Sequence, residues 1–366
     1  MIVRLLVLLC AATLVFGYAP QPKVVTQAET EFEAALATAE TDEAQIELAK
    51  EYLDNYPDNI PLGRSAQNIL NRKSDTPPDW YKTRKEAAPT STNRYLWARA
   101  SQDHDVMVEQ ANWMMENDAE NFWGYYLAAT AEWDTEEPDM DKVIGYFEQA
   151  LAKDPAQYTG YLWLGYAYED ANKPEQALEV FKAAEIVDPE DDSPKQAMLG
   201  LYAQMKDADE YFELVTPMLP TNPVTVELPV AKSTADLNTV KLNGEYTVLD
   251  CFAQWCGPCV KMSLPEWNEL TAQNEMPFKL YAVHAEGENE AAHKLLDSTD
   301  VNGKDWSLTF LWGTEEFRNQ LGGVHAFPSY YILDEKAVPR ALILGHSNHT
   351  RETLSWLIDE VKKRSS

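Results

Sequence analysis

The sequence predicts two regions of different fold class: an all-α helical repeat, which forms a solenoid, followed by an α/β domain. Three observations support this division. Residues 26–216 carry almost no strand signals and are rich in Ala, Glu, Leu and Tyr. A period of 34 residues runs through part of this stretch. After a proline-rich segment, short strand-like runs alternate with helix-like runs, which is the pattern of an α/β domain.

The N-terminus has the pattern of an export signal. Arg4 precedes the apolar run Leu5–Phe16, which is shorter than the roughly 20 residues that a membrane-spanning helix needs. We assign residues 1–19 to a signal peptide and expect cleavage at the Gly17–Tyr18 bond; the alternative is an uncleaved anchor. The protein is therefore expected to be exported: periplasmic in a Gram-negative bacterium, and otherwise secreted or in the lumen of the secretory pathway.

The chain is strongly acidic. Its 366 residues include 60 Asp and Glu against 30 Lys and Arg, a formal net charge of −30. The excess lies mainly in residues 1–223, which carry 40 acidic and 17 basic residues. This charge argues against nucleic acid or an anionic membrane surface as a partner. It fits a soluble surface, or the steering of a basic partner.

The clearest copy of the repeat runs from Tyr158 to Asp191. Two small residues, Gly165 and Ala177, allow its two helices to approach closely, and bulky apolar residues fill the space between them. Pro189 ends the second helix. The copy resembles a tetratricopeptide repeat at all eight signature positions, which are Tyr161, Leu164, Gly165, Tyr168, Ala177, Phe181, Ala184 and Pro189.

Weaker copies flank this one. Phe147 and Ala150 repeat its second helix 34 residues earlier. Downstream, Leu199-Gly200 and Phe212 indicate a third, shortened copy. Because a repeat needs neighbours to bury its faces, we expect a helical TPR-like repeat domain over residues 26–220.

The resemblance implies that these repeats bind a protein or peptide partner on a concave face. Aromatic side chains are candidate anchors there. The alternative is that they only pack helix against helix, which we expect of Tyr161. The candidates are Trp113, Trp123, Tyr125, Tyr126, Trp133, Tyr161 and Trp163.

A run of prolines separates the two regions, and we place the boundary near 221–226. Strand-like runs begin beyond it, so the α/β domain is expected over residues 224–364. The prolines are Pro217, Pro220, Pro223 and Pro229.

Two closely spaced cysteines follow an expected buried strand. The strand covers Tyr246–Phe252 and runs into Trp255-Cys256-Gly257-Pro258-Cys259. A cysteine at a helix N-terminus lies at the positive end of the helix dipole, near free backbone N–H groups, and both lower the pKa of its thiol below about 8.5. Cys256 is therefore the expected nucleophile, and Cys259, one turn further on, is the thiol that attacks the mixed disulfide. Pro258 suits the first helical turn because it lacks an N–H.

The alternative for a single Cys-x-x-Cys pair is half of a zinc site. A closed structural site needs four ligands, and the chain has no second Cys-x-x-Cys pair. We therefore expect no metal and no cofactor other than a redox-active disulfide between Cys256 and Cys259.

This segment resembles the thioredoxins. The resemblance implies that Asp250, six residues before Cys256, lies beneath the active site and helps to deprotonate Cys259; the alternative is an acid tolerated at a strand end. It also implies that Phe327-Pro328 is the cis-proline loop that faces the cysteines and pairs with a substrate strand. The candidate catalytic residues are Cys256, Cys259, Asp250 and Pro328, and the candidate substrate-binding residues are Trp255, Gly257, Pro258 and Phe327.

An insertion makes the resemblance more specific. The interval from the expected strand Lys279–His284 to Pro328 is longer than in plain thioredoxin and holds two helix-like segments, Glu290–Leu296 and Glu315–Leu321. In this it resembles the TlpA-like extracytoplasmic thiol–disulfide reductases.

The sequence also departs from the family pattern. Pro265 comes six residues after Cys259, where the family usually has its proline at five, which shifts the expected helix kink. Tyr281 or Ala282 stands where thioredoxin pairs a Lys with its buried acid. Ser329 replaces the common Thr after the cis-proline.

Three further side chains are given no catalytic role. Cys251 alternates with Asp250 along the strand, so we expect it on the opposite face of the sheet as a small buried hydrophobe. His346 and His349 fall in an apparent loop, where we expect solvated side chains rather than a pair of ligands.

Three functions compete. The first is an enzyme, a protein-disulfide oxidoreductase that reduces or isomerises disulfides of exported proteins with the help of a redox donor protein; the Gly-Pro between the cysteines resembles the reducing members of the superfamily. The second is an adaptor or scaffold that uses the repeats and has a weakly active thioredoxin fold. The third is a thiol peroxidase, whose usual Pro-x-x-x-Thr/Ser-x-x-Cys context does not occur in the sequence.

Overall fold

The computed structural model describes residues 19–74, 76–324 and 326–365. The chain divides into two compact units, of which the first ends at Pro194 and the second begins at Lys195. The expected signal peptide lies outside the described residues except for Ala19. Within the described part of the chain, no helix has both the length and the apolar character required to cross a membrane.

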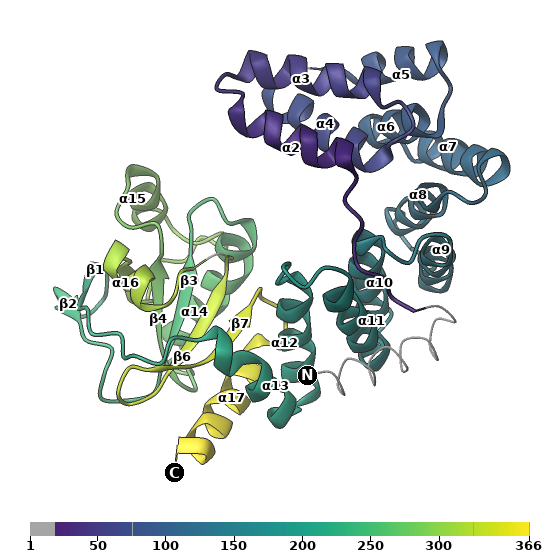
Figure 1. Cartoon of the computed structure of the whole chain (residues 1–366). Helices are drawn as coiled ribbons and strands as arrows, with labels where there is room; N and C mark the ends of the chain where they lie inside the picture. Colours follow the sequence, from purple (N-terminus) through teal and green to yellow (C-terminus); the bar gives the residue numbers. More distant parts are fainter. Residues whose placement is uncertain (1–18, 75, 325, 366) are drawn as a thin grey trace. The chain divides into compact units, whose positions relative to one another are not determined.

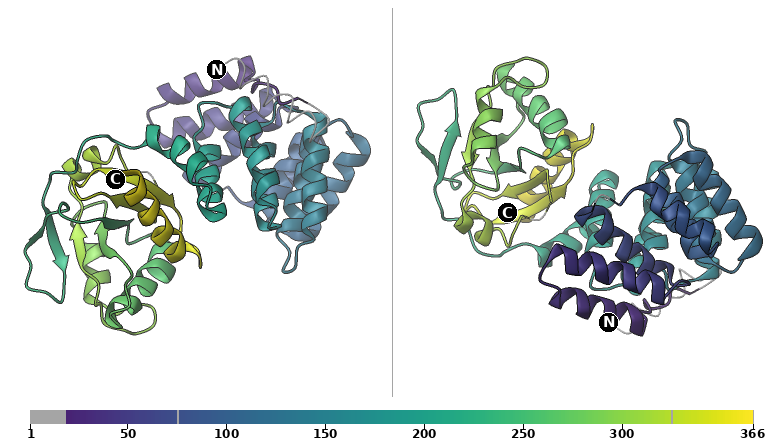
Figure 2. Two further views of the ribbon diagram at one scale, coloured as in Figure 1. Left: turned by 90° about the horizontal axis from the view of Figure 1, so that it is seen from below. Right: turned by 90° about the horizontal axis from the view of Figure 1, so that it is seen from above.

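The first unit consists of consecutive helices packed against their neighbours in the chain (Figures 1 and 2). Most begin at a short polar side chain that accepts a hydrogen bond from a backbone N–H of the first turn, as Thr41, Asn59 and Asp103 do. The helices are α2 (Gln27–Thr38), α3 (Asp42–Asn55), α4 (Ile60–Lys73), α5 (Pro78–Ala87), α6 (Ser91–Ser101), α7 (His104–Asn117), α8 (Phe122–Trp133), α9 (Met140–Lys153), α10 (Tyr158–Asp170) and α11 (Pro174–Val187).

Helices α10 and α11 form the repeat copy that the sequence marks most clearly. Tyr161, Leu164 and Phe181 are fully buried between them. A Cβ atom on Gly165 would collide with the ring of Phe181, so the close approach of the two helices requires glycine at this position. The prediction of a TPR-like helical pair is confirmed here.

The aromatic residues of this unit divide into packing and surface side chains. Trp123, Tyr126 and Tyr161 are buried; Trp123 packs against Tyr95 of α6, and Tyr126 packs against Phe147 of α9. Trp113, Tyr125 and Trp133 are half-buried, and the Trp133 indole donates to Asp170 Oδ2 at 3.1 Å. Of the seven candidate anchors, only Trp163 is well exposed, at 41%.

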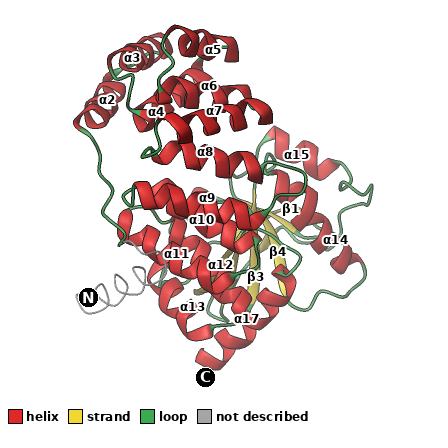
Figure 3. Cartoon of the chain, turned by 90° about the vertical axis from the view of Figure 1, so that its right-hand side faces the viewer, coloured by secondary structure: helices red, strands yellow, loops and turns green. Residues whose placement is uncertain are grey.

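The second unit combines two helices with a mixed α/β domain (Figure 3). Its helical elements are α12 (Ser193–Met205), α13 (Ala208–Val215), η1 (Thr216–Met218), η2 (Cys259–Ser263), α14 (Leu264–Ala272), α15 (Glu290–Asp297), α16 (Glu315–Gln320) and α17 (Thr350–Ser365). Its strands are β1 (Leu228–Lys232), β2 (Thr239–Val240), β3 (Thr247–Phe252), β4 (Lys279–His284), β5 (Phe310–Trp312), β6 (Ser329–Leu333) and β7 (Pro339–Leu344).

The strands form one sheet in the order β2-β1-β5-β4-β3-β6-β7. Strand β3 lies inside the sheet, parallel to β4 and antiparallel to β6, and all six of its residues are buried. Helix η2–α14 follows β3 directly, and the loop before β6 lies beside the end of β3, because Cys251 pairs with Ser329. The sheet therefore brings the Cys-x-x-Cys segment and the Phe327-Pro328 loop together.

Helices α12 and α13 belong to this unit rather than to the helical repeats. The fully buried Tyr211 hydroxyl donates to the Leu342 carbonyl of β7 at 2.8 Å and accepts from the Leu342 N–H at 2.9 Å. The prolines predict a boundary after these helices, near 221–226, whereas the structure divides the chain at Pro194. The reason for the difference is that helical periodicity and prolines do not specify which surface a helix covers.

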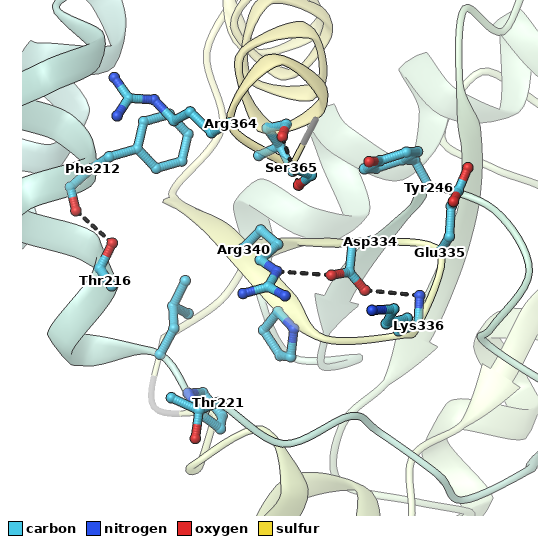
Figure 4. Close-up of a pocket in the computed structure, with 14 residues that line it drawn as sticks. Phe212, Thr216, Thr221, Tyr246, Asp334, Glu335, Lys336, Arg340, Arg364 and Ser365 are labelled. Atoms are coloured by element: carbon cyan, nitrogen blue, oxygen red, sulfur yellow. Dashed lines mark hydrogen bonds and ion pairs between the residues drawn. The ribbon is translucent and has the colours of Figure 1, made fainter.

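A pocket of about 610 Å³ lies where this helical segment meets the domain (Figure 4). Phe212 and Thr216 line one side, and Arg340 and Asp334, which form an ion pair at 2.8 Å, line another. Neither Cys256 nor Cys259 lines it, so it is separate from the thiol chemistry.

Candidate active site

The two cysteines lie where β3 passes into the following helix. Cys256 and Cys259 form a disulfide with their Cα atoms 5.3 Å apart. Cys256 keeps 4% of its surface exposed, whereas Cys259 is fully buried. The Cys259 N–H points at the Cys256 sulfur, at 3.2 Å, so a backbone donor of the first turn faces the outer sulfur.

The helix opens with a π-turn that accommodates an extra residue. η2 is a π-helical segment, and the N–H of Leu264 donates to the Cys259 carbonyl, five residues back. A π-turn is the usual way in which an α-helix absorbs a single additional residue. It accounts for the position of Pro265, six residues after Cys259, and it turns the Ser263 hydroxyl toward Asp250 Oδ2, at 3.2 Å.

Asp250 is fully buried, and the Ser263 hydroxyl that donates to it also lies 3.3 Å from the Cys259 carbonyl oxygen. Burial raises the pKa of its carboxyl to about 7, although the hydrogen bond from the Ser263 hydroxyl acts in the opposite direction. Its Oδ1 atom and the Trp267 Nε1 have no partner at bonding geometry among the described residues. The neighbour of Asp250 on β4 is Ala282, one of the two residues that the sequence suggested, and its neighbour on β6 is Tyr330.

Aromatic side chains form the rim of the site. The Phe327–Pro328 peptide bond is cis, and Pro328 is buried. The Trp255 ring packs edge-on against Phe327, with ring centroids 5.5 Å apart, and is 64% exposed. Its indole N–H donates to Glu286 Oε1 at 3.0 Å. Gly257 is half-buried and Pro258 is exposed, so the turn between the cysteines is open to solvent.

The structure contradicts the expectation for His346. Its side chain is only 3% exposed, rather than solvated. Its Nδ1 lies 2.7 Å from the Tyr330 hydroxyl and its Nε2 lies 3.0 Å from Glu266 Oε2. Sequence reasoning missed all three residues. A tyrosine in a buried strand does signal a hidden hydrogen-bond partner, but nothing local identifies that partner as a histidine 16 residues away.

His284 is a second residue that the sequence did not single out. It is buried at the end of β4, with its Nε2 2.6 Å from Gln254 Oε1 and its Nδ1 2.6 Å from the Gly287 carbonyl. Burial lowers the pKa of its imidazole. It fixes Gln254, the residue before Trp255, and so supports the loop that carries the cysteines.

Cys251 lies in the core, away from this site. It is fully buried, and burial together with the neighbouring charge of Asp250 raises the pKa of its thiol well above its ordinary value. A thiol in this environment stays protonated and unreactive.

Comparison with known proteins finds a family model that matches part of the second unit. The thioredoxin family model matches residues 230–297. A curated protein of Saccharomyces cerevisiae, small glutamine-rich tetratricopeptide repeat-containing protein 2, is 25% identical over 152 residues, which are 42% of each chain. The chain thus spans less than half the length of this relative.

Solved structures are similar to each unit separately. A thiol:disulfide interchange protein DsbE of Chlorobium tepidum is 22% identical with a TM-score of 0.30, and covers 39% of this chain and 97% of its own. StoA of Bacillus subtilis is 19% identical with a TM-score of 0.30, over 38% and 99%. A TPR protein of Thermus thermophilus is 14% identical with a TM-score of 0.33, over 48% and 89%. With the family match and the sheet described above, the chain is a protein that carries a thioredoxin domain in its C-terminal part, preceded by TPR-like helices.

Proposed function

We propose that the chain is a thiol–disulfide oxidoreductase that reduces or isomerises disulfides of exported proteins. The observation that carries this proposal is the placement of the two sulfurs. Cys256 lies at the surface end of the disulfide, against the first turn of a helix and beside the exposed Trp255, while Cys259 is buried behind it. This arrangement suits attack by the outer sulfur and resolution by the inner one.

The reaction on a substrate disulfide has two steps. The Cys256 thiolate attacks one substrate sulfur, an S–S bond forms between protein and substrate, and the second substrate sulfur leaves as a thiolate. Cys259 then loses its proton and attacks Cys256. The Cys256–Cys259 bond forms, the substrate leaves reduced, and a donor dithiol later reduces the protein again. No cofactor beyond this disulfide takes part.

Asp250 is proposed to accept the Cys259 proton. Ser263 contacts both Asp250 and the Cys259 carbonyl, and the Asp250 pKa of about 7 lets this acid take up and release a proton near neutral pH. Pro328 and Phe327 are proposed to face the substrate. Trp255, Gly257 and Pro258, which surround the outer sulfur, complete the substrate-binding surface.

The helical repeats are proposed to recruit a protein partner. The first unit contains a groove of about 780 Å³ lined by residues of α2, α4 and α8 and of the turn between α9 and α10. In it the Arg64 guanidinium stacks on the Trp123 ring, 4.5 Å from the ring centroid. Polar and aromatic groups combined in a groove of this size suit an extended peptide. Export, as the N-terminal sequence indicates, would place the protein with extracytoplasmic substrates.

Reduction of insulin by the full chain, with dithiothreitol as donor, tests the enzymatic part. The wild-type protein should accelerate the reaction, and Cys256→Ser should abolish the acceleration because no nucleophilic sulfur remains. Cys251→Ala is the matched control, since Cys251 is buried on the other face of the sheet, and should retain turnover. Retention of activity by Cys256→Ser would show that another sulfur is the nucleophile, and no acceleration by the wild-type protein would overturn the proposal and favour an adaptor role.

A further inference from the structure

A chain of buried polar side chains runs from beneath the disulfide toward the surface. It begins with Asp250, whose Oδ2 accepts from the Ser263 hydroxyl at 3.2 Å. Tyr330 is the direct cross-strand neighbour of Asp250 on β6, so the two side chains project from the same face of the sheet. Burial and the charge of Asp250 raise the pKa of Tyr330. The Tyr330 ring packs edge-on against Trp267, with ring centroids 6.0 Å apart, on the face of the sheet that holds Asp250.

The chain continues from Tyr330 through His346 to Glu266. The Tyr330 hydroxyl lies 2.7 Å from His346 Nδ1, and His346 Nε2 lies 3.0 Å from Glu266 Oε2. In a neutral imidazole one nitrogen accepts and the other donates. In the tautomer with its proton on Nε2, the ring accepts from the Tyr330 hydroxyl at Nδ1 and donates from Nε2 to the Glu266 carboxylate. The His346 side chain is 3% exposed and that of Glu266 is 32% exposed, so the chain opens to solvent at Glu266.

We propose that Ser263, Tyr330, His346 and Glu266 form a proton relay that connects Asp250 with solvent and sets the rate at which Cys259 resolves the mixed disulfide. The proposal rests on the thiol–disulfide chemistry proposed above. The reason for a relay is burial: Asp250 and Cys259 are both fully buried, so a proton that passes between them has no direct access to water. Thioredoxin has a Lys beside its buried acid, whereas the β4 neighbour of Asp250 is Ala282. The polar neighbour of Asp250 lies instead on β6, on its other side, and is Tyr330.

The relay moves one proton outward when the disulfide forms. Cys259 gives its proton to Asp250, and its sulfur attacks Cys256. Asp250 passes a proton through the Ser263 and Tyr330 hydroxyls, Tyr330 gives its own proton to His346 Nδ1, and Nε2 gives its proton to Glu266, which releases it to water. When a donor dithiol reduces the disulfide, the departing Cys259 thiolate takes a proton along the same path in reverse. Each half-reaction therefore resets the relay for the other.

The titratable groups around the relay come from every element that packs against it. Asp250 faces Tyr330 on β6, with Cys251 beside it on β3 and Ser263 and Trp267 on the helix above. Its β4 neighbour is the apolar Ala282. His346 faces Tyr330, Glu266 and the edge of the Trp267 ring. Among these groups, Glu266 is the acid that can take the proton from the imidazole.

Reaction of the reduced full-length chain with 5,5′-dithiobis(2-nitrobenzoate) separates the two steps. The first thionitrobenzoate is released when Cys256 attacks, and the second when Cys259 resolves. Thionitrobenzoate needs no proton to leave, so the second rate reports deprotonation of Cys259. We expect His346→Ala to slow the second release by about tenfold to a hundredfold, a loss expected for a proton-transfer group, and to leave the first release within about twofold. His349 is exposed in the same loop, and the variant His349→Ala is the control.

Added imidazole distinguishes proton transfer from a structural effect. It should restore the second release in His346→Ala, by replacing the lost ring, and should leave the wild type unchanged. Tyr330→Phe and Glu266→Gln, which keep the packing, should also slow the second release. Imidazole should not rescue Tyr330→Phe, because the break then lies inside the protein. A normal second release in His346→Ala and Tyr330→Phe, or a slow one in His346→Ala that imidazole leaves unchanged, would overturn the relay. Loss of both releases in the wild type would instead overturn the proposed function.

Discussion

The Ser263 hydroxyl donates to Asp250 Oδ2 at 3.2 Å, and this bond exists because η2 turns as a π-helix. Successive residues of a regular α-helix are rotated by about 100° around the helix axis. Without the extra residue of the π-turn, the side chain of residue 263 would therefore point in a different direction. The extra residue before Pro265 therefore contributes a hydroxyl to the buried acid rather than merely displacing a kink.

Burial of Asp250 should make the stability of the domain depend on pH. The folded-state pKa of about 7 lies above the ordinary value of 3.8, so the folded state binds the proton more tightly. Stability is then highest below about pH 4, falls as pH rises toward 7, and is constant above it. Asp250→Asn removes this loss and should stabilise the oxidised domain at pH 8 by up to about 4 kcal/mol, at 1.36 kcal/mol per pH unit.

Hydrogen exchange of the β3 amides in the full chain measures this effect, once the exchange rates are corrected for the pH dependence of intrinsic exchange. Asp250→Asn should raise their protection at pH 8 and leave it nearly unchanged at pH 4. Equal protection in wild type and variant at both pH values would mean that Asp250 ionises in the folded state as freely as in water.

Cys259→Ser should trap covalent complexes with substrates. The variant keeps the Cys256 nucleophile but lacks the sulfur that resolves the mixed disulfide, so the first step goes to completion and the second fails. Non-reducing electrophoresis after exposure to a disulfide-bonded protein should show a new band that disappears on reduction. The double variant Cys256→Ser/Cys259→Ser is the control and should show none; a band there would place the reactive sulfur elsewhere.

The Cys256 thiol should titrate below the ordinary value of about 8.5. The first-turn N–H of Cys259 faces its sulfur, and helix N-termini stabilise negative charge. The rate of alkylation by iodoacetamide as a function of pH gives the pKa directly. The measurement is made on the Cys259→Ser variant, so that a single active-site thiol reacts. A midpoint at or above 8.5 would show that the helix terminus does not activate this sulfur.

Two glycines in the repeats should respond in opposite ways to alanine. A methyl group on Gly165 collides with Phe181, and overpacking of this kind costs about 1–3 kcal/mol. Gly145 in α9 has nothing within 4 Å of its would-be Cβ, so Gly145→Ala should stabilise the helix by about 0.5–1 kcal/mol. Thermal unfolding followed by far-ultraviolet circular dichroism should show a lower midpoint for the first variant and an unchanged or higher one for the second. The reverse order would mean that α10 and α11 do not pack as described.

Truncation should show where the catalytic unit begins. A chain of residues 195–366 keeps Tyr211 and its two bonds to Leu342, whereas a chain of residues 224–366 loses them and exposes the face of β7 that Tyr211 covers. The longer fragment should therefore be more resistant to thermolysin and should reduce insulin about as well as the whole chain. Equal stability of the two fragments would show that α12 and α13 do not belong to the catalytic unit.

A groove-filling variant tests recruitment by the repeats. Ser65 is exposed and lines the groove of the first unit. In the Cys259→Ser background, Ser65→Trp should reduce the capture of native partners severalfold without changing insulin capture, because the groove rather than the active site is blocked. Glu109→Trp, on an exposed position of α7 that does not line the groove, is the control. Unchanged capture by Ser65→Trp would mean that partners bind elsewhere.

The two fold classes and the position of the cysteines follow from the amino-acid sequence without any structure. A 34-residue period, a buried strand that runs into Trp255-Cys256-Gly257-Pro258-Cys259, and the spacing to Phe327-Pro328 are local patterns, and local patterns follow from backbone geometry and periodicity. The helical pair around Gly165 and Phe181 was accessible for the same reason, since one small and one large residue must meet where two helices touch.

Which distant side chains share a space depends instead on tertiary packing. Whether Tyr211 covers the repeats or the sheet depends on how a helix packs, and its periodicity is the same in both cases. The register of β3 against β6 sets Tyr330 beside Asp250, and the path of the loop after β7 brings His346 back to Glu266. These partners are far apart in the chain, and their attraction arises only once burial has removed the water that would otherwise satisfy them.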